Sequence, residues 1–157
     1  MGTRSSIAMK TVDGIKAIYC HWDGYVDHNG RILRENYSTE AQVTELINLG
    51  DLSSLGTKIG DVHPFDAKFG DEPELPICDD WCKAYHRDRG EDWAQVAPQT
   101  WTQDVKEWVK DMGQSGCEYF YLFNGQDWLV HKVGDVDVYD FPVFDFVEVE
   151  ILKEIVS

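Results

Sequence analysis

Two runs rich in apolar residues, separated by a polar turn, occupy residues 4–23. Asp13-Gly14 lies near the middle of this segment and is a common hairpin turn, so the pattern predicts a β-hairpin with Val12 opposite Ile15. This register gives one mostly apolar face, which is expected to meet the core. Its members are Ser5, Ile7, Met9, Ile18, Cys20 and Trp22.

Helical periodicity appears in two longer segments. Thr39 and Gln42 match a capping box, and Gly50 suits the end of that helix. Residues 102–112 carry the clearest helical pattern, which Gly113 ends. The apolar stripes are Val43, Leu46 and Ile47 in the first helix and Val105, Trp108, Val109 and Met112 in the second. A shorter helical turn containing Ile32 and Leu33 is expected to be capped by Asn29.

Residues 117–123 and 128–133 form a second hairpin pattern around Asn124-Gly125, and residues 143–151 resemble a last strand. Residues 51–100 are irregular and rich in Pro and Gly, with a short helix expected at 80–87. The order of elements predicts one α+β domain over residues 1–157. We expect an antiparallel sheet of two hairpins and a C-terminal strand, packed with two or three helices.

The charge of the 157 residues is unevenly distributed. The net charge is −15, of which residues 1–60 carry −1 and residues 61–157 carry −14. Such a field repels nucleic acid and anionic membranes and attracts basic proteins, although the excess charge also serves solubility alone. The expected partner-binding acids are Asp71, Glu72, Glu74, Asp79, Asp80, Asp135, Asp137, Asp140, Asp145, Glu148 and Glu150.

The N-terminus lacks the apolar stretch of a secretory signal, and no apolar run is long enough to span a bilayer. We therefore expect a cytoplasmic protein with reduced thiols. The spacing of Cys78, Cys82 and His86 would place three metal ligands on one helix face, but it lacks the second ligand pair of a structural zinc site. We expect no metal and no cofactor. Arg87 and its acidic neighbours indicate a salt-bridged turn.

The predicted hairpin places Arg4 opposite Asp23 on its half-polar face, beside His21. Cys20 and His21 point to opposite faces and so cannot form a catalytic dyad with each other. The candidate ligand-binding residues are Arg4, Tyr19, His21, Asp23, Tyr25, His28 and Arg31. The alternative is an ordinary Arg4–Asp23 ion pair beside a structural histidine.

Several strings of this chain resemble a family of small proteins encoded by bacteriophages and prophages. They are MGTRSSIA at residues 1–8, YCHWDGY at 19–25, HNGR at 28–31, LGDLSSL at 49–55 and RDRGE at 87–91. The resemblance implies an accessory protein that acts in the cytosol of a bacterial host, and it implies no catalytic residues.

Three functions follow as hypotheses. The first is a non-enzymatic inhibitor that binds a basic host protein, such as a DNA- or RNA-binding defence complex, through the acidic region. The second is a protein that sequesters a nucleotide or another small ligand with the seven polar residues named above. The third is a hydrolase or transferase that uses His21 with Asp23.

Overall fold

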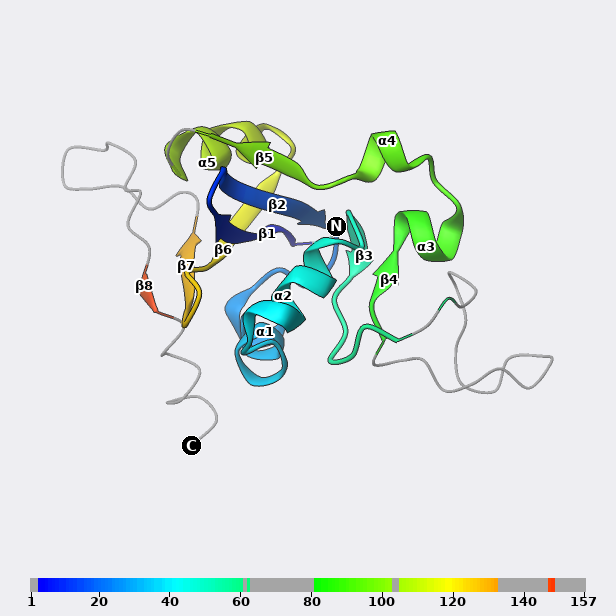
Figure 1. Cartoon of the computed structure of the whole chain (residues 1–157), viewed down its shortest axis with the longest axis horizontal. Coiled ribbons are helices and arrows are strands. Elements are labelled where there is room, and N and C mark those ends of the chain that lie inside the picture. The colour runs from blue at the N-terminus through cyan, green and yellow to red at the C-terminus, as the bar shows by residue number, and fades with distance from the viewer. Residues whose placement is uncertain (1–2, 61, 63–80, 103–104, 133–146, 149–157) are drawn as a thin grey trace.

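The computed structural model describes residues 3–60, 62, 81–102, 105–132 and 147–148. Its strands form one eight-stranded sheet in the order β4-β3-β2-β1-β6-β7-β8, and β5 also pairs with β2 (Figure 1). The strands are β1 Arg4–Thr11, β2 Gly14–Cys20, β3 Leu52–Ser54, β4 Lys83–Ala84, β5 Gln99–Trp101, β6 Cys117–Phe123, β7 Trp128–Lys132 and β8 Val147–Glu148. The helices are the π-helix η1 Val26–Gly30 and the α-helices α1 Arg31–Asn36, α2 Glu40–Ile47, α3 Tyr85–Arg89, α4 Trp93–Val96 and α5 Val105–Gln114.

The α+β class is confirmed, but the sheet is mixed rather than antiparallel. β1 runs parallel to β6, and β2 runs parallel to β3. Helices precede the second strand of each parallel pair: η1, α1 and α2 lead from β2 to β3, and α5 leads from β5 to β6. A helical crossover returns the chain in the same direction, so the strand that follows lies parallel to its neighbour. Hairpin signals alone could not reveal these crossovers.

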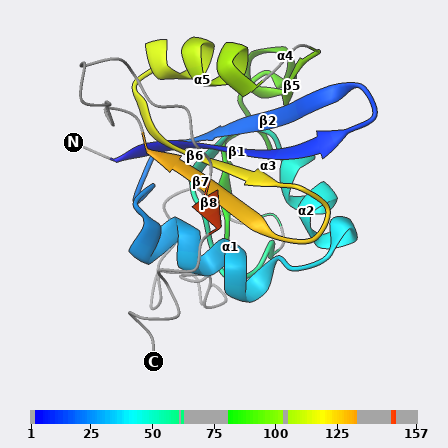
Figure 2. The same cartoon turned by 90° about the vertical axis from the view of Figure 1, so that its left-hand side faces the viewer.

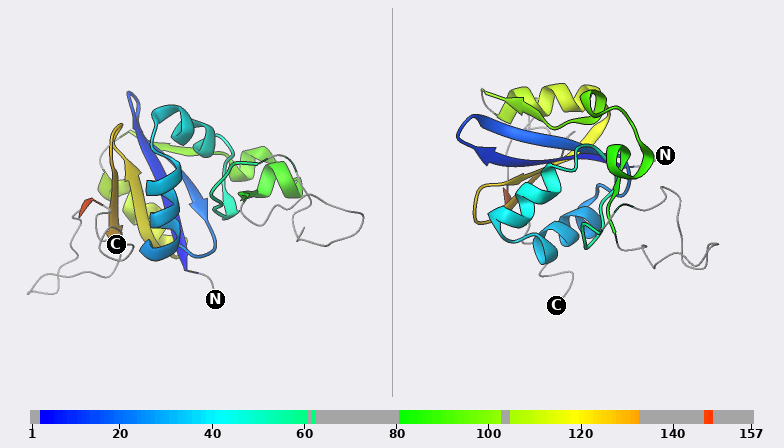
Figure 3. Two further views of the ribbon diagram at one scale, coloured as in Figure 1. Left: turned by 90° about the horizontal axis from the view of Figure 1, so that it is seen from below. Right: turned by 45° about the vertical axis from the view of Figure 1, so that its right-hand side comes forward.

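Helices cover both faces of the sheet. α1 and α2 lie on one face and α5 on the other (Figures 2 and 3). The predicted capping box of Thr39 and Gln42 is present, and Gly50 follows α2 with φ 80°. The α2 stripe of Val43, Leu46 and Ile47 is buried in the core of the α1/α2 face. Trp108, Val109 and Met112 of α5 are buried in the core of the opposite face.

The register predicted for the first hairpin is wrong, because the pair that closes the turn is Thr11 and Gly14 rather than Val12 and Ile15. Thr11 pairs with Gly14, so the turn consists of Val12 and Asp13 rather than Asp13 and Gly14. A Cβ atom at Gly14 would lie 2.1 Å from the carbonyl oxygen of Trp101 on β5. Gly14 therefore allows β5 to approach β2, which is a different role from the turn position assigned from the sequence. The slip moves each partner by two residues and so leaves the strand faces unchanged.

The facing prediction holds within the strands and fails beyond Cys20. Ile7, Met9, Ile18 and Cys20 share one buried cluster, as predicted. Trp22 was expected in that cluster but is 43% exposed, because β2 ends at Cys20. Asp23 then adopts φ 57°, and a Cβ atom at Gly24 would lie 2.8 Å from the Ser5 side chain. This tight turn against β1 prevents the strand from continuing, so Arg4 does not lie opposite Asp23.

The second hairpin is confirmed, with β6 and β7 paired from Phe123 and Trp128 outward. Of the predicted strand at 143–151, only β8 lies within the described residues, where it pairs with β7. The short helix expected at 80–87 is instead α3, and Lys83–Ala84 before it is a strand. Asn29 lies inside η1 and does not cap a helix. Among the described residues, no helix combines the length and apolar character that a membrane crossing requires.

Candidate functional site

The sheet divides the seven candidate ligand-binding residues into two groups. Arg4, Tyr19 and His21 belong to the α5 side, where Tyr19 packs against the core beneath α5. The other four, Asp23, Tyr25, His28 and Arg31, lie in the turn after β2 and in the helical segment of the α1/α2 side. A single pocket lined by all seven side chains is therefore not formed.

The first group is held together at the end of β2. The Tyr19 hydroxyl and the His21 Nδ1 atom lie 2.8 Å apart, and Arg4 Nη1 donates to the Ser115 carbonyl at 3.4 Å. Burial raises the pKa of Tyr19 to about 12, against a lowering effect of Arg4. Partial burial, followed by the positive charge of Arg4, lowers the pKa of His21. Both effects favour the neutral form of the imidazole.

The second group consists of local pairs on the surface. His28 Nε2 lies 4.0 Å from the Asp23 carboxylate, and Arg31 bonds Asp27 at 2.6 Å with i,i+4 spacing. Exposed pairs of this kind contribute only about 0.5 kcal/mol to stability. His21 and Asp23 thus have different partners, and the geometry does not assemble the acid–base pair of the hydrolase hypothesis.

Asn29 has a role that the sequence pattern did not indicate. Its side chain is fully buried, and its Nδ2 atom donates to Ser5 Oγ at 3.2 Å and to the Trp22 carbonyl at 3.4 Å. These bonds join η1 to the ends of β1 and β2. Because Ser5 lies 24 positions from Asn29, only the fold reveals that this amide fixes the turn after β2.

The cysteines that the structure describes are buried thiols. Burial raises the pKa of Cys20 and of Cys117 to about 12, and it raises that of Cys82 as well. These thiols are protonated at neutral pH and so are poor nucleophiles. Cys78 lies outside the described residues, and Cys82 precedes a strand rather than lying on a helix with His86. No group of three metal-ligating side chains occurs within the described ranges.

The predicted salt-bridged turn after residue 86 is present. The Arg87 guanidinium bonds the fully buried Asp88 carboxylate at 3.0 Å and the carbonyls of Gly60 and Cys82. Asp88 also accepts the Ala84 backbone N–H at 2.8 Å. Arg89 pairs with Glu91 at 3.1 Å. These arginines join chain segments to one another, which favours a structural role over phosphate binding.

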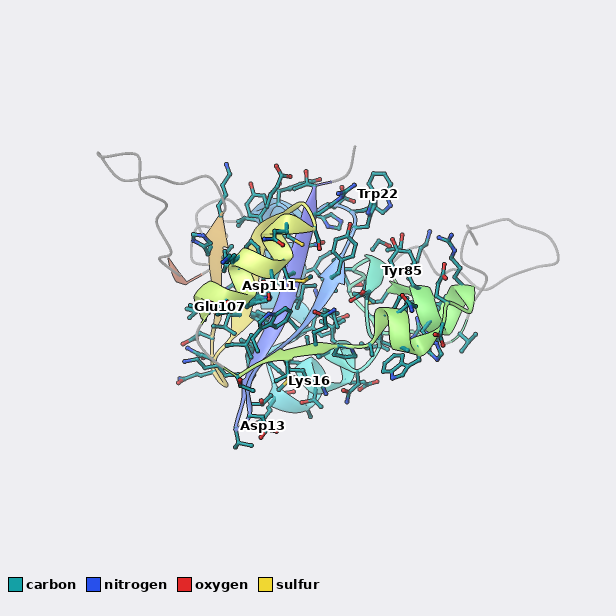
Figure 4. All side chains as sticks on the ribbon, turned by 90° about the horizontal axis from the view of Figure 1, so that it is seen from above. Asp13, Lys16, Trp22, Tyr85, Glu107 and Asp111 are labelled. Carbon is teal, nitrogen blue, oxygen red and sulfur yellow. The ribbon has the colours of Figure 1, made fainter. Side chains whose placement is uncertain are left out.

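Most of the predicted partner-binding acids cannot be placed on this fold. Asp71, Glu72, Glu74, Asp79 and Asp80 lie outside the described residues, and so do Asp135, Asp137, Asp140, Asp145 and Glu150. Glu148 is the one predicted acid that lies within the described residues, and it forms part of β8. The α5 side does carry exposed acids of its own, including Glu107 and Asp111 (Figure 4).

A cavity of about 240 Å³, which no sequence pattern indicated, lies beside β2 on the α5 side. It is lined by Ala17, Tyr19, Asp51, Gln99, Trp101, Met112 and Ser115. Asp51 is the charged residue of this lining. Its Oδ1 atom accepts the Tyr19 backbone N–H at 2.9 Å, and burial raises its pKa to about 6 despite that bond. Asp51 lies 32 positions from Tyr19, so only the fold brings them together.

Asp51 occupies a break along the edge of β2. One part of that edge pairs with β5 at Ile15–Ala17, and the other pairs with β3 at Cys20. Between them the Tyr19 N–H has no strand to bond, and the Asp51 carboxylate supplies the acceptor. The same residue bonds Val96 and Tyr85 through its backbone. The position of Asp51 is therefore fixed from several sides.

A larger hollow of about 740 Å³ follows the outer surface of α2. It is lined by Glu40, Ala41, Thr44, Glu45, Asn48 and Leu49. All six belong to one helix and its end, so polar groups from different elements do not converge there as they do around Asp51.

No family model matches this chain, and neither a curated protein nor a solved structure matches it. Two chemically distinct features of the molecule bear on its function. One is the acidic excess of residues 61–157, and the other is the cavity beside β2.

Proposed function

We propose that this protein is a non-enzymatic inhibitor that binds a basic protein of a bacterial host in the cytosol through its acidic region. The observation that carries the proposal is the charge of −14 on residues 61–157 against −1 on residues 1–60. Complementary charge accelerates association and fixes the orientation of the partners. The resemblance to small bacteriophage proteins supports a host target, such as a DNA- or RNA-binding defence complex.

The distribution of charge along the chain supports the same proposal. Residues 71–80 and 135–150 together contain eleven acids and no lysine or arginine. A local excess of one sign attracts a partner of the opposite charge.

The chemistry of the described residues favours binding over catalysis. The thiols of Cys20, Cys82 and Cys117 are protonated and buried, and Arg87 is engaged with Asp88. His21 bonds Tyr19, while Asp23 lies nearest to His28. Each group that suggested a reaction from the sequence has a structural partner in the fold.

The test is capture of a partner from a bacterial lysate by the full-length chain, followed by identification and titration of the purified partner. We expect a basic protein whose affinity falls by at least about tenfold between 50 and 200 mM salt, because several charge contacts are screened. Capture of no protein, or of a partner that is indifferent to salt, contradicts the proposal.

A matched pair of variants separates the acidic region from net charge. One variant replaces five acids of the acidic region with their amides: Asp71, Glu72, Glu74, Asp79 and Asp80. The control replaces five exposed acids from the first 60 residues: Asp13, Asp27, Glu35, Glu40 and Glu45. Both variants lose five negative charges. Because only the first variant changes the acidic region, only the first should lose binding to the partner. Equal loss in both variants would show a nonspecific effect of net charge.

A further inference from the structure

The cavity beside β2 combines three kinds of lining group from separate parts of the chain. Asp51 precedes β3, the aromatic rings of Tyr19 and Trp101 belong to β2 and β5, and Met112 belongs to α5. Figure 4 shows this side of the molecule, with β5 crossing between α5, which carries Asp111, and α3, which carries Tyr85.

The acid and the aromatic rings are held in place before any ligand arrives. Asp51 Oδ1 accepts the Tyr19 N–H at 2.9 Å, and within the described chain its Oδ2 atom has no hydrogen bond. The Trp101 indole is oriented by its Nε1–H, which donates to Asp111 Oδ2 at 2.8 Å. One carboxylate oxygen therefore remains for a ligand, beside aromatic surface that is already positioned.

The chemistry of this lining selects a positive charge. A carboxylate next to aromatic rings attracts an ammonium or guanidinium group through both its charge and the ring faces. The Met112 thioether and the Ala17 methyl offer apolar contact to a short stem. The volume of about 240 Å³ lies below the usual range for drug-sized ligands, which favours a compact ligand.

Arg4, on the same side of the sheet, is engaged elsewhere. Its guanidinium donates to the Ser115 carbonyl, and its charge lowers the pKa values of Tyr19 and His21. The pKa of Asp51 responds to burial and to the Tyr19 N–H, with no contribution from Arg4.

We propose that the cavity beside β2 is a binding site for a small organic cation, with Asp51 as the charge partner and Tyr19 and Trp101 as the aromatic walls. None of the acids proposed to bind the protein partner is among the described residues that line this cavity. Binding of a small cation and capture of a protein partner can therefore succeed or fail separately.

The experiment is an NMR titration of the ¹⁵N-labelled full-length protein at pH 7.5, with the Trp101 indole N–H assigned through a Trp101→Phe variant. The probes are butylammonium, butylguanidinium and, as the anionic counterpart of the same stem, butyrate. We expect saturable shifts of the Trp101 signal with both cations and none with butyrate. Shifts that do not saturate, or equal shifts with butyrate, would overturn the site.

Two variants with the same change of charge complete the test. Asp51→Asn keeps an oxygen for the Tyr19 N–H and removes the charge, so the affinity for butylammonium should fall at least about tenfold. Glu107→Gln on the exposed face of α5 should stay within about twofold of the wild type, because it does not line the cavity. Equal losses, or no loss in Asp51→Asn, would contradict the proposal. If Asp51→Asn does not fold, the backbone amide shifts of the wild-type protein serve instead. Shifts on butylammonium binding that spread beyond the residues lining the cavity would contradict the proposal.

Discussion

Asp51 is the residue at which structure and ionisation are most closely connected. Its carboxylate bonds the Tyr19 N–H, while burial raises its pKa to about 6 from the ordinary 3.8. Tyr85 on α3 and Cys117 on β6 are the titratable groups that also respond to its charge. Both Tyr85 and Cys117 are neutral near pH 7, so neither group relieves the cost of burying the ionised Asp51 carboxylate.

This raised pKa gives a pH prediction for Asp51→Asn. Between its unfolded and folded pKa values, Asp51 holds a proton more strongly in the folded protein, so its contribution to stability falls as the pH rises through about 4 to 6. Asparagine does not ionise. The free energy of unfolding of the variant should therefore increase relative to wild type by about 1 kcal/mol between pH 5 and 7.5. Urea unfolding of both proteins at each pH measures this difference.

The comparison begins at pH 5 because the isoelectric point is about 4.5, where solubility is lowest. Titration of the remaining acids is common to both proteins and cancels in the difference. A difference that stays constant over this range would show that Asp51 is already ionised at pH 5 in the folded protein.

At the scale of elements, two tryptophans should differ in their contribution to stability, because one packs a helix against the sheet and the other lies at the surface. Trp108 of α5 is fully buried, donates from Nε1 to Ser6 Oγ at 2.9 Å and meets Phe120 edge-on. Trp108→Ala should therefore cost about 3–5 kcal/mol. Trp22 is 43% exposed and contacts His21, so Trp22→Ala should cost about 1 kcal/mol or less, below the cost expected from the predicted register. Denaturant unfolding of the two variants measures both values, and a similar cost for both would contradict this packing.

At the scale of the whole molecule, the net charge of −15 should make stability depend on salt. Like charges repel one another in the compact state, and salt screens that repulsion. Raising the salt concentration from 50 to 500 mM should stabilise the protein by about 1 kcal/mol, or a few degrees in Tm. Sodium and potassium chloride should act alike in a calorimetric scan. A Tm that does not rise would show that the acids are too far apart to interact.

The sequence determined the local elements of this protein. The side-chain facing within β1 and β2, the stripe of α5, the capping box at Thr39 and the bounds of β6 were all predictable. Each depends on residues that are close together in the chain. The side-chain period of a strand or helix is a property of the backbone, so neighbouring residues suffice to reveal it.

The tertiary structure decided the features that depend on distant contacts. β5 lies against Gly14, Gly14 pairs with Thr11 instead of forming the turn, and the sheet is mixed rather than antiparallel. The turn at Asp23 divides the polar residues between two sides of the sheet. Asp51 gains its acceptor role only because β2 lacks a strand neighbour at Tyr19. The local sequence does not specify which segment lies beside a given edge, because that is set by packing of the whole chain.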